Sequence, residues 1–388
     1  MARVLIGWEF GANRGHAVRL TAIADALQTA GHDISFAVTR LDAMHAQKVP
    51  AASIWQAPVS PRMMAGRARA IGPAVGMADI LARLGMDDPL IVVSMLSGWH
   101  RLFDAIRPDL VIADFAPFLL LAARGRLPTI SVGTGFTSPP SGMATLPALI
   151  SGAAGTDQAA LLAAVNDGLA QDGEPPLAAL PQMFAADRPV VATFAELDPY
   201  AGDRAEPLVF PDAHDPAVPG GGGDEIFAYF PDFIPADSPL WLALAASGLK
   251  VRVHIGLGGA ALQAAVARHG LIVEPEPVPF ARIAERSRLL VSHGGHGFIC
   301  AGLVAGLPHV VCHFDLEKLT HGLALARVGL GGHVALSAIR PQPFAQSLVQ
   351  LFNDEAIAGR AHAAAPVFRG RGQAPFRQAM LEAVTALA

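Results

Sequence analysis

Two series of alternating strand and helix patterns, separated by a stretch rich in glycine and proline, constrain the fold of this chain more than any other feature. The first series opens with an apolar run at residues 3–7, a helical pattern at residues 16–30 and a second apolar run at residues 34–38. The second series opens at residues 226–230 with the same alternation. Strands joined by helices pair in parallel, because a crossover helix carries the chain back to the same edge. We therefore expect an α/β fold of two Rossmann-like domains.

The stretch between the two series, residues 207–224, ends in Pro219 and four consecutive glycines, a composition typical of a flexible linker. It divides the chain into an N-terminal domain at residues 1–206 and a C-terminal domain at residues 225–365. Residues 366–388 are predicted to form a C-terminal helix that could pack back on the N-terminal domain. Ligands of such sheets bind at the carboxyl ends of the strands. We therefore expect the two domains to face each other across a ligand-binding cleft.

The composition is that of a well-packed globular protein. The 388 residues are enough for two full cores, with 52% hydrophobic and 16% charged residues. The net charge of −5 and the isoelectric point near 6.3 exclude a global basic footprint, so nucleic acid is not expected as the main partner. Cys300 and Cys312 lie in predicted buried elements, which indicates reduced thiols rather than a disulfide framework.

The chain enters its first predicted strand within a few residues of Met1, and this predicts a protein without a secretory leader. No apolar run reaches the length that a membrane span requires. We therefore expect a cytoplasmic protein. The mean hydropathy of +0.40 leaves peripheral membrane contact open.

One strand-turn-helix unit in the second series predicts an anion site. An apolar run at residues 287–292 is followed by His293-Gly294-Gly295-His296-Gly297 and then by a short helical pattern at residues 298–305. The first N–H groups of a helix have no intrahelical acceptor and lie at its positive end, so phosphate is their commonest ligand. His293 adds a side-chain donor. The alternative is a tight turn with an incidental histidine.

At this turn, and at other places in the same order, the chain resembles the inverting GT-B glycosyltransferases of family 1, which include the UDP-glycosyltransferases and the macrolide-type antibiotic glycosyltransferases. The matching residues cover both halves of the chain at the expected separations. They are Gly15-His16, Asp114-Phe115, Val278-Pro279, His293-Gly294-Gly295 with Gly297, Gly306 with Pro308, and Glu317-Lys318.

The resemblance implies transfer of a sugar from a UDP- or dTDP-sugar to a hydroxyl of a small hydrophobic or lipid-like acceptor, with inversion. His16 would be the general base, because an imidazole titrates near neutral pH. Asp114 would bond its other ring nitrogen, as a triad carboxylate does. Simpler alternatives remain open for both: His16 could merely cap or pack, and Asp114 could cap the helix that follows it.

The resemblance also implies a donor site in the second half. His293, Gly294, Gly295, His296 and Gly297 would bind the diphosphate, Val278 and Pro279 the nucleobase, and Glu317 and Lys318 the sugar. The nucleotide sugar is a co-substrate, and no other cofactor and no metal is implied. An exposed Glu and Lys at a helix start is the alternative for residues 317–318.

Five positions depart from the family pattern, and they leave the donor unidentified. Arg19 replaces the proline of the Gly-His motif, and Ala301 replaces the glutamate that commonly holds the donor ribose. Glu317-Lys318 replaces an Asp-Gln pair, and His296 stands where the residue is usually small or aromatic. Two rival functions therefore stay open. One is a GT-B sugar-nucleotide epimerase or hydrolase, and the other is a non-catalytic sugar-nucleotide-binding auxiliary protein.

Six histidines cluster within the second half of the chain. They show no familiar ligand spacing with cysteines or carboxylates, so no metal is predicted there. The six are His293, His296, His309, His313, His321 and His333. The Gly256-Leu257-Gly258-Gly259 turn fits neither the dinucleotide fingerprint nor a P-loop, which argues against NAD and ATP.

Overall fold

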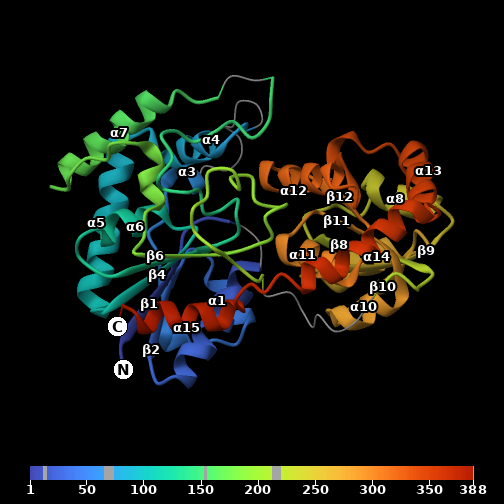
Figure 1. Cartoon of the computed structure of the whole chain (residues 1–388), viewed down its shortest axis with the longest axis horizontal. Coiled ribbons are helices and arrows are strands. Elements are labelled where there is room, and N and C mark those ends of the chain that lie inside the picture. The colour runs from blue at the N-terminus through green and yellow to red at the C-terminus, as the bar shows by residue number, and fades with distance from the viewer. Residues whose placement is uncertain (12–14, 65–73, 153–154, 212–219, 388) are drawn as a thin grey trace. The chain divides into compact units, whose positions relative to one another are not determined.

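The computed structural model describes residues 1–11, 15–64, 74–152, 155–211 and 220–387. These residues divide into two compact units (Figure 1). Unit 1 comprises Met1–Phe210 together with Ala374–Ala388, and unit 2 comprises Pro211–Gln373. No helix among the described residues is both long enough and apolar enough to cross a membrane.

Unit 1 is built on a parallel sheet of seven strands in the order β3-β2-β1-β4-β5-β6-β7. Its central strands are almost wholly buried, as expected for a sheet covered on both faces. The strands are β1 Arg3–Trp8, β2 Asp33–Val38, β3 Ile54–Gln56, β4 Leu110–Asp114, β5 Thr129–Gly133, β6 Arg188–Ala192 and β7 Leu208–Val209.

Helices lie on both faces of this sheet. Apolar residues of α1 and α15 share one core with alternate residues of β1, β2, β4, β5 and β6, so the C-terminal helix is part of unit 1 (Figure 1). Gly7 on β1 faces the other side, where a Cβ would lie 2.1 Å from Leu119 and 3.2 Å from Trp99. Only glycine lets α5 and α6 approach β1 so closely.

Two long helices of unit 1 begin at aspartate side-chain caps. Asp88 accepts a hydrogen bond from Leu90 N at the start of α5, and Asp157 accepts from Ala159 N and Ala160 N at the start of α7. The helices are α1 Gly15–Thr29, α2 Leu41–Ala46, α3 Pro61–Met64, α4 Met77–Leu81, α5 Pro89–Ile106, α6 Pro117–Ala123, α7 Gln158–Gln171 and α15 Phe376–Thr385.

Unit 2 contains a second parallel sheet, of six strands in the order β10-β9-β8-β11-β12-β13. Its strands are β8 Glu225–Pro231, β9 Lys250–Gly256, β10 Ile272–Glu274, β11 Ser287–Ser292, β12 His309–His313 and β13 Gly331–Ala335. Its helices are α8 Pro239–Ala246, α9 Ala260–Ala267, α10 Phe280–Arg286, α11 His296–Ala305, α12 Leu316–Arg327, α13 Pro341–Phe352 and α14 Glu355–Arg369.

In unit 2, as in unit 1, helices pack on both faces of the sheet. Apolar residues of α8 and α13 pack on one face of β8, β9, β11 and β12. On the opposite face, α11 packs against α14 (Figure 1). Asp315 caps α12 by accepting a hydrogen bond from Lys318 N at 2.9 Å.

Several element boundaries differ from the sequence predictions. Leu208–Val209 form β7 of the first sheet, although these residues were assigned to the linker, whose residues 212–219 lie outside the described part of the chain. Helix α14 runs through the boundary proposed at residue 365. Helix α5 is not among the elements predicted above, although Asp88-Pro89 is a cap followed by proline at the first helical position.

Candidate functional site

In unit 1 the structure brings together His16 and Asp114, the two residues predicted to act as a pair. His16 lies in the first turn of α1, and Asp114 is the last residue of β4. Their facing atoms, His16 Nδ1 and Asp114 Oδ2, are 2.9 Å apart. The contact forms because β1 and β4 are neighbours with Trp8 opposite Asp114, and the His16 ring stacks on Trp8 at 5.1 Å between centroids.

The surroundings of this pair set the tautomer of His16. The Asp114 side chain is fully buried, whereas that of His16 is 15% exposed. A carboxylate facing Nδ1 keeps the hydrogen on that nitrogen, so Nε2 presents a lone pair. Arg19 Nη1 lies 3.4 Å from the other oxygen of Asp114, so this departure from the family pattern adds a cation to the pair.

Gly11 leaves Nε2 of His16 uncovered. A Cβ at this position would lie 2.4 Å from Nε2, and the Gly11 φ of +104° disfavours any residue with a side chain. The backbone on the other side of the pair is also unusual, because Phe115 directly follows Asp114 with a positive φ of 44°. A bulky residue in this conformation indicates strain that the surrounding structure maintains.

Glu9 is a buried carboxyl near this pair that the sequence reasoning missed. Its side chain accepts hydrogen bonds from Trp99 Nε1, Phe118 N and Leu119 N, so it sits at the start of α6. Burial raises the pKa of Glu9 to about 8, although these three donors oppose the shift. Its signal in the sequence is an acidic residue directly after the first apolar strand.

A cavity of about 270 Å³ in unit 1 begins beside Phe115 and extends along β5 and β6. Its lining combines apolar side chains such as Leu120 and Phe184 with the hydroxyl groups of Ser131 and Thr137. Such a mixture suits a small, mostly apolar molecule that carries some hydroxyl groups.

In unit 2 the glycine turn lies between β11 and α11, where the sequence predicted an anion site. Ser292 Oγ accepts a hydrogen bond from Gly294 N at 3.0 Å and lies 2.7 Å from His309 Nε2. Gly294 has a φ of +94°, and a Cβ there would lie 2.6 Å from Val311. The turn therefore requires a glycine at position 294, and the hydrogen bond to Ser292 Oγ stabilises it.

His293 is a buried, neutral side chain at this turn. Its Nδ1 lies 3.4 Å from the carbonyl oxygen of Tyr229, while a Cβ on Gly295 would lie 3.0 Å from Nε2. Nε2 therefore points along the turn. Burial lowers the pKa of His293 to about 4, and the charge on Lys318 acts in the same direction.

Helix α11 starts two residues earlier than predicted, so His296 and Gly297 belong to its first turn. Gly295 is the N-cap and has no side chain that could bond the first N–H groups. The His296 ring does not cover them either, because it packs near Cys300 Sγ and lies 5.5 Å from the His321 ring. The backbone of this turn therefore fits the predicted diphosphate role better than the His296 side chain does.

Glu317 and Lys318 begin α12 beside the glycine turn, since a Cβ on Gly294 would lie 3.3 Å from Lys318 Cβ. The Lys318 side chain is only 5% exposed, and its ammonium pairs with the Glu317 carboxylate. The alternative of an exposed helix-start pair is therefore wrong for Lys318. Its charge is held inside the unit, where it acts on Glu317.

The other residues that the sequence predicts for a donor site lie around α11. Val278 is half-buried and Pro279 is the exposed N-cap of α10, whose first residue Phe280 packs against Phe298 at 5.7 Å. Ala301 is buried in α11, so no carboxylate stands at the position that commonly holds a donor ribose.

No protein-family model and no curated protein matches the chain, whereas solved structures do. The glycotransferase of kitacinnamycin is 16% identical over 100% of this chain and 99% of that chain, with a TM-score of 0.68. The calicheamicin glycosyltransferase is 20% identical over 100% and 98%, with a TM-score of 0.68. A spinosyn rhamnosyltransferase complexed with thymidine diphosphate is 15% identical over 99% and 100%, also with a TM-score of 0.68.

The fold is GT-B. The predicted fold class, two α/β units that each contain a parallel sheet, is thereby confirmed. The GT-B fold accounts for the six-stranded sheet with the glycine turn as well as for the seven-stranded sheet that carries His16 and Asp114. At sequence identities this low, the similarity shows the fold alone, because one fold supports many different reactions.

Proposed function

We propose that this protein is a glycosyltransferase that moves a sugar from a UDP- or dTDP-sugar to a hydroxyl of a small hydrophobic or lipid-like acceptor, with inversion. The His16–Asp114 contact carries the proposal. A histidine whose tautomer is set by a buried carboxylate is oriented to act as a general base. A protein that only binds its ligand does not need a general base.

In the proposed reaction, His16 Nε2 removes the proton of the acceptor hydroxyl while its oxygen attacks the anomeric carbon of the sugar. The bond between that carbon and the diphosphate oxygen breaks, and the nucleoside diphosphate leaves with the electron pair. A single displacement of this kind inverts the anomeric centre. Asp114 stabilises the imidazolium that forms, through the 2.9 Å contact with Nδ1.

Unit 2 would bind the donor. The uncapped N–H groups at the start of α11 suit the diphosphate, whose charge grows as the glycosidic bond breaks. Loss of one such preorganised donor typically costs about 3 kcal/mol of transition-state stabilisation. His293 would add a ring nitrogen to this site, Glu317 would accept hydrogen bonds from the sugar hydroxyls, and Lys318 would hold Glu317 in place. The helix end and His293 would do this electrostatic work without a bound metal.

The cavity beside Phe115 supports a small acceptor. Phe115, the residue that follows Asp114, contributes to its lining, which offers apolar contacts, hydroxyl groups and the charged side chains of Arg204 and Glu206. Among the structures with the same fold, one is a spinosyn rhamnosyltransferase complexed with the spinosyn aglycone. An aglycone with a free hydroxyl is therefore the acceptor class to test first.

A screen of UDP- and dTDP-sugars against hydroxyl-bearing aglycones, with released nucleoside diphosphate as the readout, tests this function. We expect turnover that depends on both substrates. His16→Ala should then lower turnover at least about 100-fold while nucleotide affinity stays within a few fold, the usual scale for a lost general base. Full activity of His16→Ala would overturn the assigned mechanism.

A second candidate is a sugar-nucleotide-binding protein without transferase activity, favoured by Ala301 and by the closed Glu317–Lys318 pair. It predicts nucleotide binding without turnover for every donor and acceptor pair, and the same screen separates it from the first.

A further inference from the structure

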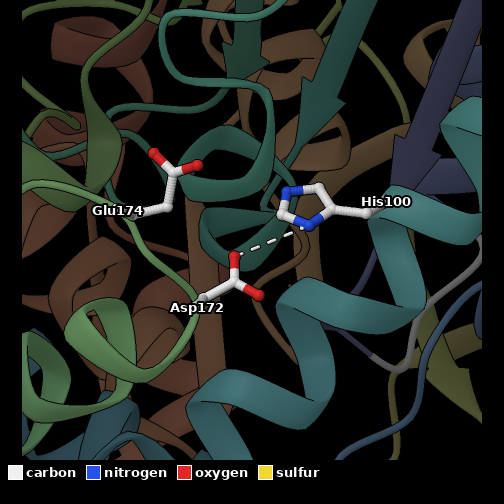
Figure 2. A group of neighbouring side chains, drawn as sticks. All are labelled: His100, Asp172 and Glu174. Atoms are coloured by element: carbon white, nitrogen blue, oxygen red, sulfur yellow. Dashed lines mark ion pairs between the residues drawn. The ribbon is translucent and has the colours of Figure 1, made fainter.

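A histidine and two carboxylates that take no part in the proposed transfer meet in unit 1. His100 lies on α5, and Asp172 and Glu174 follow α7. One nitrogen or oxygen atom from each residue lies within 4.8 Å of those of the other two. Figure 2 shows Asp172 facing the His100 ring, with Glu174 beside the pair. Their side chains are 22%, 10% and 8% exposed, so all three polar groups are largely shielded from water.

The orientation of the His100 ring presents a lone pair to Asp172. His100 Nε2 lies 3.2 Å from the carbonyl oxygen of Ala122, so this nitrogen carries the hydrogen of the neutral ring. In the neutral ring, Nδ1 then faces Asp172 Oδ2 with lone pairs opposed and no hydrogen between them. Metal-binding histidines commonly have this arrangement, with one N–H donated to a backbone carbonyl and the other nitrogen on the ion.

The spacing of the two facing atoms suits a shared ion better than a hydrogen bond. His100 Nδ1 and Asp172 Oδ2 are 3.5 Å apart, whereas the corresponding atoms of His16 and Asp114 are 2.9 Å apart. Charge-assisted N–H···O bonds measure about 2.7–2.9 Å. Two ligands that are each about 2.0–2.2 Å from one tetrahedral zinc ion are about 3.3–3.5 Å from each other.

One oxygen of the Asp172 carboxylate lacks the hydrogen-bond donor that a buried polar atom commonly has. Its buried Oδ2 accepts no hydrogen bond from any residue that the structure describes. Glu174 differs because its Oε1 accepts a hydrogen bond from Arg126 Nε at 3.1 Å. The carboxylate oxygen without a hydrogen-bond donor is therefore Asp172 Oδ2, the atom that faces His100.

We propose that His100, Asp172 and Glu174 bind one divalent transition-metal ion, with zinc as the expected species and water completing its coordination. One imidazole and two carboxylates are ligands that zinc accepts. The ion would tie α5 to the segment after α7. The ion would lie beside His100, which contacts Ala122 near the C-terminal end of α6. Asp114 precedes the N-terminal end of the same helix. The proposed role of the ion is therefore structural, and it contributes no group to the transfer.

Calorimetric titration of the full chain with zinc chloride, after dialysis against a chelator, tests this site. We expect the wild type to bind one zinc ion per chain that His100→Gln does not bind. Asp172→Asn should weaken this binding at least about 10-fold. Arg126→Gln should strengthen it, because Glu174 loses its competing partner. His362→Gln, which removes an exposed histidine of α14, is the matched control and should bind as the wild type does.

Cobalt(II) gives a second, spectroscopic readout of the same site. The wild type should show the intense visible absorption of low-coordinate cobalt(II), and His100→Gln should lack it. Wild-type protein that takes up no zinc in the micromolar range would overturn the proposal. So would equal zinc binding in the wild type, His100→Gln and Asp172→Asn, since the cluster would then be an imidazolium–carboxylate pair only.

Discussion

His321 Nδ1 on α12 lies 2.9 Å from the carbonyl oxygen of Gly294, so one helix of unit 2 holds the glycine turn that begins another. Because Gly294 also packs between Val311 and Lys318, the turn is fixed on three sides. A diphosphate would meet N–H groups whose directions are already set, and preorganisation of this kind is what lowers the barrier of a transfer reaction.

Gly294→Ala should destabilise the protein by at least about 2 kcal/mol, because a left-handed conformation with a side chain costs about 1–2 kcal/mol before the contact with Val311 is counted. Gly297→Ala is the matched control, since a Cβ there meets nothing within 4 Å and alanine is the better helix former. Chemical denaturation measures both changes. Equal stability of the two variants would contradict the described geometry of the turn.

His309 should make unit 2 sensitive to acid. Its Nδ1 has no hydrogen-bond partner among the described residues, and burial lowers its pKa to about 3. As the pH falls below about 6.5, the unfolded chain binds a proton at this residue that the folded chain binds only near pH 3. The free energy of unfolding therefore falls across this window, by at most about 1.4 kcal/mol per pH unit for one group.

His309→Gln removes this group, so the stability of the wild type relative to the variant should decline as the pH is lowered from about 6.5 toward 4. Denaturant titrations at several pH values measure the difference. His362→Gln, at an exposed position, should show no such trend. A difference between the wild type and His309→Gln that does not change with pH would show that His309 is not held neutral in the folded protein.

Asp114→Asn should lower turnover by about 100-fold to 10,000-fold without weakening nucleotide binding, because its amide N–H favours the tautomer of His16 in which Nε2 carries the hydrogen. Asp109→Asn is the matched control: Asp109 precedes the same strand and pairs with Arg3 on the surface. Steady-state kinetics with nucleotide titration separates the two effects. A loss of nucleotide affinity that accounts for the whole decrease would contradict a role for Asp114 in orienting His16.

The sequence was sufficient for those parts of the fold that rest on local patterns. Apolar runs between glycine and proline turns predicted the two sheets, and the motif order placed His16 beside Asp114 across 98 positions. What it could not show depends on packing between distant segments. Lys318 reads as a surface residue at a helix start, and its burial follows from the way Gly294 packs against it.

The same limit explains the cluster of His100, Asp172 and Glu174. The histidine stands on a helix that the sequence did not predict, and its partners follow another helix more than 70 residues later. A tertiary contact between α5 and α7 brings these three residues together, so no local sequence spacing predicts the cluster.

The central claim is that unit 2 binds the diphosphate of a nucleotide sugar at the start of α11. Calorimetric titration with dTDP, UDP and GDP sugars, and with the corresponding nucleosides, tests it most directly. We predict that at least one sugar nucleotide binds in the micromolar range, and that its nucleoside, which lacks the diphosphate, binds at least about 100-fold more weakly, a difference of about 2.7 kcal/mol. Failure of all sugar nucleotides to bind, or equal affinity for nucleoside and sugar nucleotide, would contradict it.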